Sequence, residues 1–215
     1  MRSGRVWQVG IGCAVLAALL TALVAARWLP LLRLDVLVAR DLHASAVTSP
    51  GTTGLMRVLS NWVWDPWTMR ALAVLACAVL WRRGDRPRAV RVAVVTVAAA
   101  VVSQGMKGAV GRDRPLWPDP VDAAHFAAFP SGHAMTAAAV CGMLLWLLPP
   151  SAPKAWARGA WVLAAVSVLG VGFTRVYLGV HWPSDVLAGW LLGVALAALA
   201  IGWPGRRNRP EAAAR

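Results

Sequence analysis

Two polar side chains in the last fifth of the sequence have the types and spacing that nucleophilic catalysis requires. His181 and Asp185 lie four residues apart at the start of an apolar segment, and side chains at positions i and i+4 meet on one face of a helix. A carboxylate that accepts the proton of one imidazole nitrogen leaves the other nitrogen as a directed nucleophile or base. The spacing is typical of a catalytic pair, although a structural capping pair would use the same residues.

Three cations and a Ser-Gly turn supply what an anion would need beside such a nucleophile. Lys107 and Arg114 lie at and after the end of an apolar segment, and Arg175 lies six residues before His181. The sequence Ser131-Gly132-His133 opens another apolar segment, and the free N–H groups at a helix start bind anions readily. Taken one at a time, these segments are also compatible with solvated loops and helix caps.

Together these groups indicate phosphoryl transfer. Cations and backbone N–H groups would neutralise the phosphate oxygens in the transition state, while one histidine attacks phosphorus and the other protonates the leaving oxygen. Placing an ionisable residue near lipid costs free energy, so ionisable residues at the ends of apolar segments indicate a functional site. We find no Asp, Glu and His cluster with divalent-metal spacing in the sequence, so no metal or other cofactor is expected.

The elements that must position these groups are long apolar segments. Of the 215 residues, 59% are hydrophobic and 14% are charged, whereas soluble domains are roughly 45–50% apolar. A net charge of +13 on so apolar a chain is typical of a basic membrane protein and not of a nucleic-acid-binding protein. Six segments approach the roughly 20 residues that span a bilayer: 7–26, 62–81, 89–110, 131–148, 159–178 and 184–203.

We therefore expect an all-α bundle of six transmembrane helices in a single domain over residues 1–215. The second helix is expected to begin nearer Trp67, because Arg70 lies inside the apolar segment and a charge at membrane depth is costly. At 1.5 Å per residue, Lys107 lies about 24 Å along a helix from Arg91, so it reaches the opposite face of the membrane.

The distribution of basic residues predicts the orientation of these helices. Thirteen of the 22 basic residues fall on one side of the six-helix arrangement, and short cytoplasmic loops carry the excess of Lys and Arg. Both termini are therefore expected in the cytoplasm, with the candidate catalytic residues facing the outside of the cell membrane. The terminal residues in this count are Arg2, Arg5, Arg206, Arg207, Arg209 and Arg215.

The three segments resemble the three-part signature of the type 2 phosphatidic acid phosphatase family, whose superfamily includes vanadium haloperoxidases. The signature corresponds here to Lys107 with six residues before Arg114-Pro115, then Pro130-Ser131-Gly132-His133, then Arg175 with five residues before His181 and three more before Asp185. The resemblance implies a membrane phosphatase that uses no metal and forms a phosphohistidine.

The resemblance also implies a role for each matched residue. His181 would be the nucleophile, Asp185 its orienting group and His133 the acid that protonates the leaving group. The phosphate would be held by Lys107, Arg114, Arg175, Ser131 and the backbone of Gly132.

Three residues in or beside the signature depart from it or fall at its variable positions. The family usually has Ser immediately before the third-segment Arg, where this chain has Thr174, so a hydroxyl is kept. Arg112 and Asp113 lie at variable positions of the first segment, and we assign them no role.

Two other functions share part of this pattern. A haloperoxidase would hold vanadate in the same anion site, but such relatives are typically soluble. A non-catalytic membrane protein that binds or transports phospholipids would need the cations but not the His181–Asp185 pair with His133. The favoured substrate is a lipid with a terminal phosphate or diphosphate: a polyprenyl diphosphate, phosphatidic acid or phosphatidylglycerol phosphate. The sequence does not predict an oligomeric state.

Overall fold

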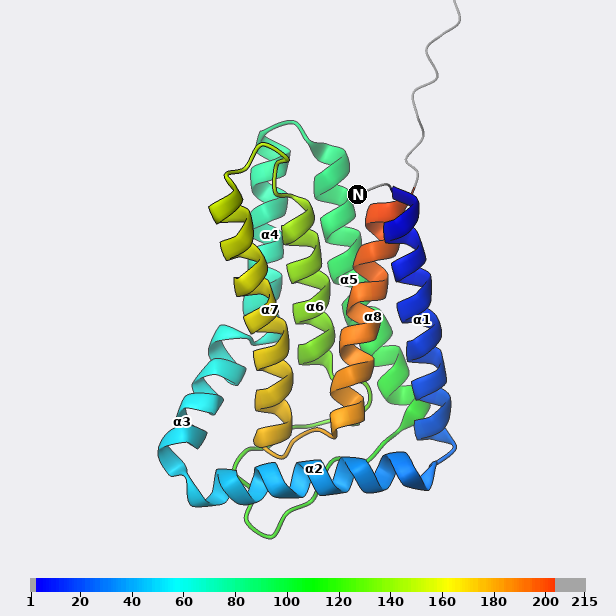
Figure 1. Cartoon of the computed structure of the whole chain (residues 1–215), viewed down its shortest axis with the longest axis vertical. Helices are drawn as coiled ribbons and strands as arrows, with labels where there is room; N and C mark the ends of the chain where they lie inside the picture. Colours follow the sequence, from blue (N-terminus) through cyan, green and yellow to red (C-terminus); the bar gives the residue numbers. More distant parts are fainter. Residues whose placement is uncertain (1–2, 204–215) are drawn as a thin grey trace, which may run out of the picture.

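The structure, a computed structural model, describes residues 3–203, and within this range it contains helices and no strands. The elements are α1 (Ser3–Ala25), α2 (Leu29–Thr48), α3 (Pro50–Val58), the π-helical segment η1 (Leu59–Val63), α4 (Pro66–Arg82), α5 (Arg86–Val110), α6 (Gly132–Trp146), α7 (Lys154–Tyr177) and α8 (Pro183–Gly202). Six of them, α1 and α4 to α8, stand side by side as a bundle (Figure 1). The all-α class expected from the sequence is confirmed.

The six upright helices correspond to the six apolar segments. Helices α1, α5, α7, α8 and the continuous stretch from α3 to α4 are long and apolar enough to cross a membrane. Helix α6 has 15 residues and is packed against α4, α5, α7 and α8. The second bundle helix, α4, begins at Pro66, next to Trp67 as expected, and the Asp65 side chain caps it by accepting the N–H of Trp67 at 2.8 Å.

Small residues bring α6 and α8 into close contact. A Cβ atom added to Gly189 would lie 2.6 Å from the carbonyl oxygen of Ser131, and one added to Gly193 would lie 2.5 Å from that of Met135. Glycines four residues apart allow transmembrane helices to approach to backbone contact. This packing places the start of α6 against the start of α8, where Ser131 N–H donates to the carbonyl of Asp185 at 2.9 Å.

Helix α2 was not predicted from the sequence, because the segment 27–61 lacks a long apolar run. It lies across one end of the bundle, and α3 rises from it at an angle (Figure 1). Its buried positions are Asp35, Ala39, His43 and Ala46, which repeat at three- and four-residue spacing and so share one helix face. Exposed Leu34 and Leu37 lie on its other faces, as in helices that lie in a membrane interface.

Basic and aromatic side chains gather at the end of the bundle opposite α2. The guanidinium groups of Arg88 and Arg91 lie 5.7 and 5.4 Å from the ring centroid of Trp146. Trp7 of α1 and Trp203 meet edge to face at 5.6 Å, so both ends of the described chain lie here (Figure 1). The other terminal arginines, listed here, lie outside the described residues: Arg2, Arg206, Arg207, Arg209 and Arg215.

Candidate active site

The candidate catalytic segments meet at the α2 end of the bundle. They are the segment that follows α5, the start of α6, and the turn between α7 and α8, all of which lie at the end of the bundle that α2 crosses (Figure 1). Gly111 ends α5 in the left-handed conformation with φ +59°, which glycine adopts without strain. Gly179 does the same at φ +69° in the turn after α7, two residues before His181.

His181 is 1% exposed and is contacted on both ring nitrogens. Its Nδ1 lies 3.3 Å from Oδ2 of Asp185, and its Nε2 lies 3.2 Å from Nη1 of Arg114. Burial, followed by the guanidinium of Arg114, holds the pKa of His181 well below its ordinary value. The ring is therefore neutral at physiological pH, and the Asp185 contact leaves the Nε2 lone pair facing Arg114.

Asp185 is 0% exposed and is held on both carboxylate oxygens. Oδ2 accepts the backbone N–H of Trp182 at 2.9 Å, which caps the start of α8. Oδ1 accepts Nη1 of Arg112 at 2.6 Å. The carboxylate is thus fixed before it contacts His181.

Two of the predicted cations hold the loop that precedes α6. Lys107 donates its Nζ proton to the carbonyl of Ala127. Arg114 donates from Nε to the carbonyl of Phe126 at 2.9 Å and from Nη1 to that of Val180. Burial lowers the pKa of Arg114, although a guanidinium keeps its charge at neutral pH.

The third cation, Arg175, is supported by the π-helical segment η1. It is 3% exposed, and its Nη1 donates to Oγ of Ser60 at 3.0 Å and to Oδ1 of Asn61 at 3.2 Å. Its buried Nε has no hydrogen-bond partner among the described residues. A buried guanidinium N–H without an acceptor is costly, so this group is suited to binding an anion.

The Ser-Gly-His segment presents two further polar groups. Ser131 is 0% exposed, and within residues 3–203 its Oγ makes no hydrogen bond. A Cβ added to Gly132 would lie 3.2 Å from Oγ of Ser103, so the Ser103 side chain packs closely against the Gly132 backbone. His133 is partly exposed, and its Nε2 lies 3.8 Å from Oδ2 of Asp65.

Sequence reasoning missed several residues that contact this set. Arg112, which received no role, bridges Asp185 and Asp35 of α2 at 2.6 and 2.7 Å. Asp65 faces His133 from the start of α4. No signal in the sequence identified Asp35, because its burial is evident only once α2 is placed and its partner Arg112 lies 77 residues away. Thr174 donates its hydroxyl to the carbonyl of Val171 at 2.8 Å, so it stabilises α7.

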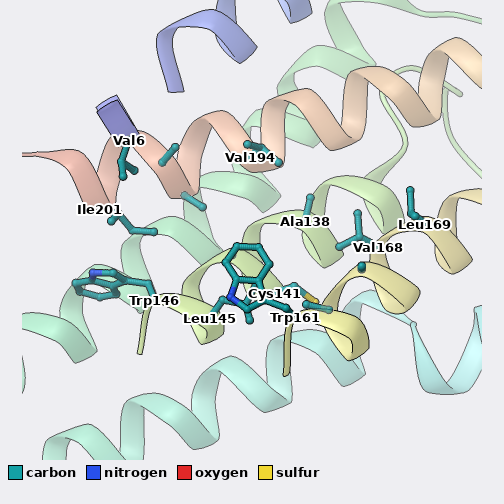
Figure 2. Close-up of a pocket in the computed structure, with 15 residues that line it drawn as sticks. Val6, Ala138, Cys141, Leu145, Trp146, Trp161, Val168, Leu169, Val194 and Ile201 are labelled. Atoms are coloured by element: carbon teal, nitrogen blue, oxygen red, sulfur yellow. The ribbon is translucent and has the colours of Figure 1, made fainter. Parts of the chain in front are cut away.

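A separate cavity of about 810 Å³ lies between α6, α7 and α8. Figure 2 shows Trp146, Trp161 and Cys141 among the aliphatic side chains that line it. Val6 and Ile201 place it toward the end of the bundle opposite α2. Its lining includes none of the predicted site residues and offers an anion no charged group.

Comparison with known families assigns more than half of the chain to one superfamily. The model of the PAP2 superfamily matches residues 88–209, a range that includes every predicted site residue. The chain belongs to the PAP2 superfamily.

Two curated PAP2 relatives have named activities. An undecaprenyl-diphosphatase of Sulfolobus acidocaldarius is 33% identical over 161 residues, which cover 69% of this chain and 68% of that protein. Phosphatidylglycerophosphatase B of Bacillus subtilis is 34% identical over 111 residues, which cover 51% of this chain and about half, 54%, of that protein.

The same architecture occurs in a solved PAP2 structure. The crystal structure of a transmembrane PAP2-type phosphatidylglycerolphosphate phosphatase from Bacillus subtilis matches with a TM-score of 0.79. The match covers 90% of this chain and 94% of that chain at 24% identity. This PAP2 chain is therefore a multi-pass membrane protein with the same fold.

Proposed function

We propose that this PAP2 protein is an integral-membrane lipid phosphatase that removes the terminal phosphate of a lipid phosphate or diphosphate. Its two named relatives act on lipids of this kind according to their names. The candidate site lies at one end of a bundle of membrane-spanning helices (Figure 1). A lipid whose acyl or prenyl chain lies in the bilayer would present its headgroup at this depth.

The observation that carries the proposal is the double contact of His181. Asp185 lies 3.3 Å from Nδ1 of the ring, and Arg114 lies 3.2 Å from Nε2. The lone pair of the neutral imidazole therefore points toward a cation. A protein that only binds phosphate needs the cation, but it does not need a buried nucleophile oriented by a carboxylate.

In the proposed first step, Nε2 of His181 attacks phosphorus and the bond from phosphorus to the leaving oxygen breaks. Lys107, Arg114 and Arg175 neutralise the phosphate oxygens with Ser131 and the N–H of Gly132. His133 gives its proton to the leaving oxygen, and the Asp65 carboxylate beside it stabilises the protonated ring.

In the proposed second step, water attacks the phosphohistidine and His133 accepts the water proton. The bond between phosphorus and Nε2 breaks, inorganic phosphate is released, and His181 is neutral again. Each proton transfer in this scheme uses a side chain of this chain.

We infer that the preferred substrate is a polyprenyl diphosphate. A glycerophospholipid phosphate is the next candidate. Purified protein in detergent is expected to release phosphate from undecaprenyl diphosphate, phosphatidylglycerol phosphate or phosphatidic acid faster than from their soluble short-chain analogues, because the acyl or prenyl chain anchors the headgroup at the helix ends. Phosphate release measured over this panel tests the proposal. Equal or faster turnover of the soluble compounds would overturn the lipid assignment.

The proposed orientation places the site outside the cytoplasm. Short connections at the opposite end carry Arg82, Arg83 and Arg86, and such residues are retained in the cytoplasm. A cysteine introduced at Asp122 of a variant lacking native cysteines is therefore expected to react with an impermeant maleimide in intact cells, whereas one at Gly84 is expected to react only after permeabilisation. The reverse pattern would place the chemistry in the cytoplasm.

A further inference from the structure

A chain of buried charges connects helix α2 to the candidate nucleophile. Asp35 of α2 is 1% exposed and Asp185 of α8 is 0% exposed. The Arg112 guanidinium lies between them, with Nη2 2.7 Å from Oδ2 of Asp35 and Nη1 2.6 Å from Oδ1 of Asp185. The other oxygen of Asp185 contacts His181.

Ser184 ties the same groups together at the start of α8. Its backbone N–H donates to Oδ1 of Asp35 at 2.9 Å, and its hydroxyl donates to Oδ2 at 2.6 Å. The Ser184 Oγ also lies 2.7 Å from Nη1 of Arg112. Asp35 thus contacts both the helix that carries Asp185 and the cation that holds it.

We infer that Arg112 and Asp35 are positioning residues, which hold the Asp185 carboxylate so that it keeps His181 in the Nδ1–H tautomer. This inference rests on the proposed function and adds a helix outside the signature segments to the catalytic machinery. The ion pair with Arg112 favours the charged form of Asp185, and an ionised carboxylate can only accept hydrogen bonds. The imidazole must then carry its proton on Nδ1 and its lone pair on Nε2.

The bridge requires arginine in particular. Two carboxylates are contacted by two different Nη atoms of one planar group, a geometry that the single ammonium of lysine does not reproduce. The ring of Trp182 packs against the guanidinium with its centroid 5.6 Å away. Because its Nη atoms already contact Asp35, Asp185 and Ser184, we expect Arg112 to act on the reaction through Asp185.

The test compares Arg112→Gln and Asp35→Asn with Arg40→Gln and Asp41→Asn, which make the same charge changes at exposed positions of α2. Arg112→Gln is expected to lower kcat by about ten- to a hundredfold, the scale on which outer partners of metal-bound histidines act, and to leave KM unchanged. Asp35→Asn should lower kcat less, because an amide oxygen still accepts one hydrogen bond. The double variant should match Arg112→Gln, because Asp35 acts through Arg112.

A spectroscopic readout separates positioning from a merely structural role. The chain has four histidines, so ¹⁵N-histidine labelling allows the His181 ring nitrogens to be assigned by comparison with His181→Ala. The wild type is expected to show a single tautomer with Nε2 unprotonated, and Arg112→Gln a mixture of tautomers. Arg112→Lys should restore kcat only in part.

Three outcomes would overturn the inference: a loss of activity confined to KM, an unchanged tautomer in Arg112→Gln, or equal losses in the control variants. If Arg112→Gln does not fold, as thermal unfolding would reveal, the kcat and tautomer of Asp35→Asn decide the question. If the wild type hydrolyses none of the lipids, the proposed function fails, and the tautomer measurement still judges the role of Arg112.

Discussion

His181→Ala is expected to abolish phosphate release while the protein still inserts into the membrane. The substitution removes the atom that would form the covalent bond to phosphorus, and no other side chain has its two contacts, to Asp185 and to Arg114, in the part of the chain that the structure describes. Loss of the serine nucleophile of a protease lowers kcat by about 10⁶-fold, and a loss on that scale would bring the residual rate below detection. Phosphate release from the lipid panel measures the effect.

The control for this variant is His125→Ala, because the His125 ring is exposed, and this variant should keep wild-type activity. The wild type, mixed briefly with lipid labelled at the terminal phosphate, should carry an acid-labile, alkali-stable label that His181→Ala lacks. Retained binding of lipid phosphate by His181→Ala is compatible with the proposal, since the cations remain. Phosphate release near the wild-type rate would refute the phosphohistidine mechanism.

The bundle and the predicted site residues could be located from the sequence because helix geometry links position to depth. Lys107 follows Arg91 by 16 residues and Arg175 follows Arg158 by 17, so each approaches the membrane face opposite its arginine. Three short segments, separated along the chain, were thereby assigned to one end of the bundle, where the structure brings them together (Figure 1). Apolar length and i, i+4 spacing were sufficient for this result.

Helix α2 could not be predicted by the same reasoning. Polar residues interrupt its apolar residues, and its buried face carries Asp35 and His43. The segment therefore does not resemble a membrane-spanning helix. It forms because its buried face pairs with groups from distant parts of the chain. His43 stacks on Trp117 at 4.3 Å, and Asp35 binds Ser184, 149 residues away.

Arg112 illustrates why a signature does not identify every residue that supports a site. Local spacing identifies groups that act on the phosphate, because those groups occupy fixed positions in each segment. The partner of a catalytic carboxylate is chosen by tertiary packing, and the close contact of α6 with α8 together with the placement of α2 brings Arg112 between Asp35 and Asp185. A buried carboxylate without a cation would be strongly destabilising. Here the cation is Arg112, which occupies a variable position of the first signature segment.

His133→Ala is expected to have the second largest effect, and the size of this effect should depend on the leaving group. General acid catalysis contributes about 10²–10⁴-fold when the departing oxygen needs a proton. The leaving group of phosphatidic acid or phosphatidylglycerol phosphate is an alkoxide, which departs slowly unless it is protonated. The leaving group of a polyprenyl diphosphate is a phosphate monoester, whose second pKa is near 6, so it departs readily without a proton.

The measurement is kcat/KM for the wild type and His133→Ala on a monoester and a diphosphate lipid. This parameter reports the steps up to and including the first irreversible one, which in this scheme forms the phosphohistidine, so the later role of His133 toward water does not affect the comparison. The loss on the monoester should exceed the loss on the diphosphate by at least about tenfold. Asp65→Asn, which alters the carboxylate 3.8 Å from the His133 ring, should show the same order with smaller losses. Equal losses on both lipids would show that His133 does not protonate the leaving oxygen.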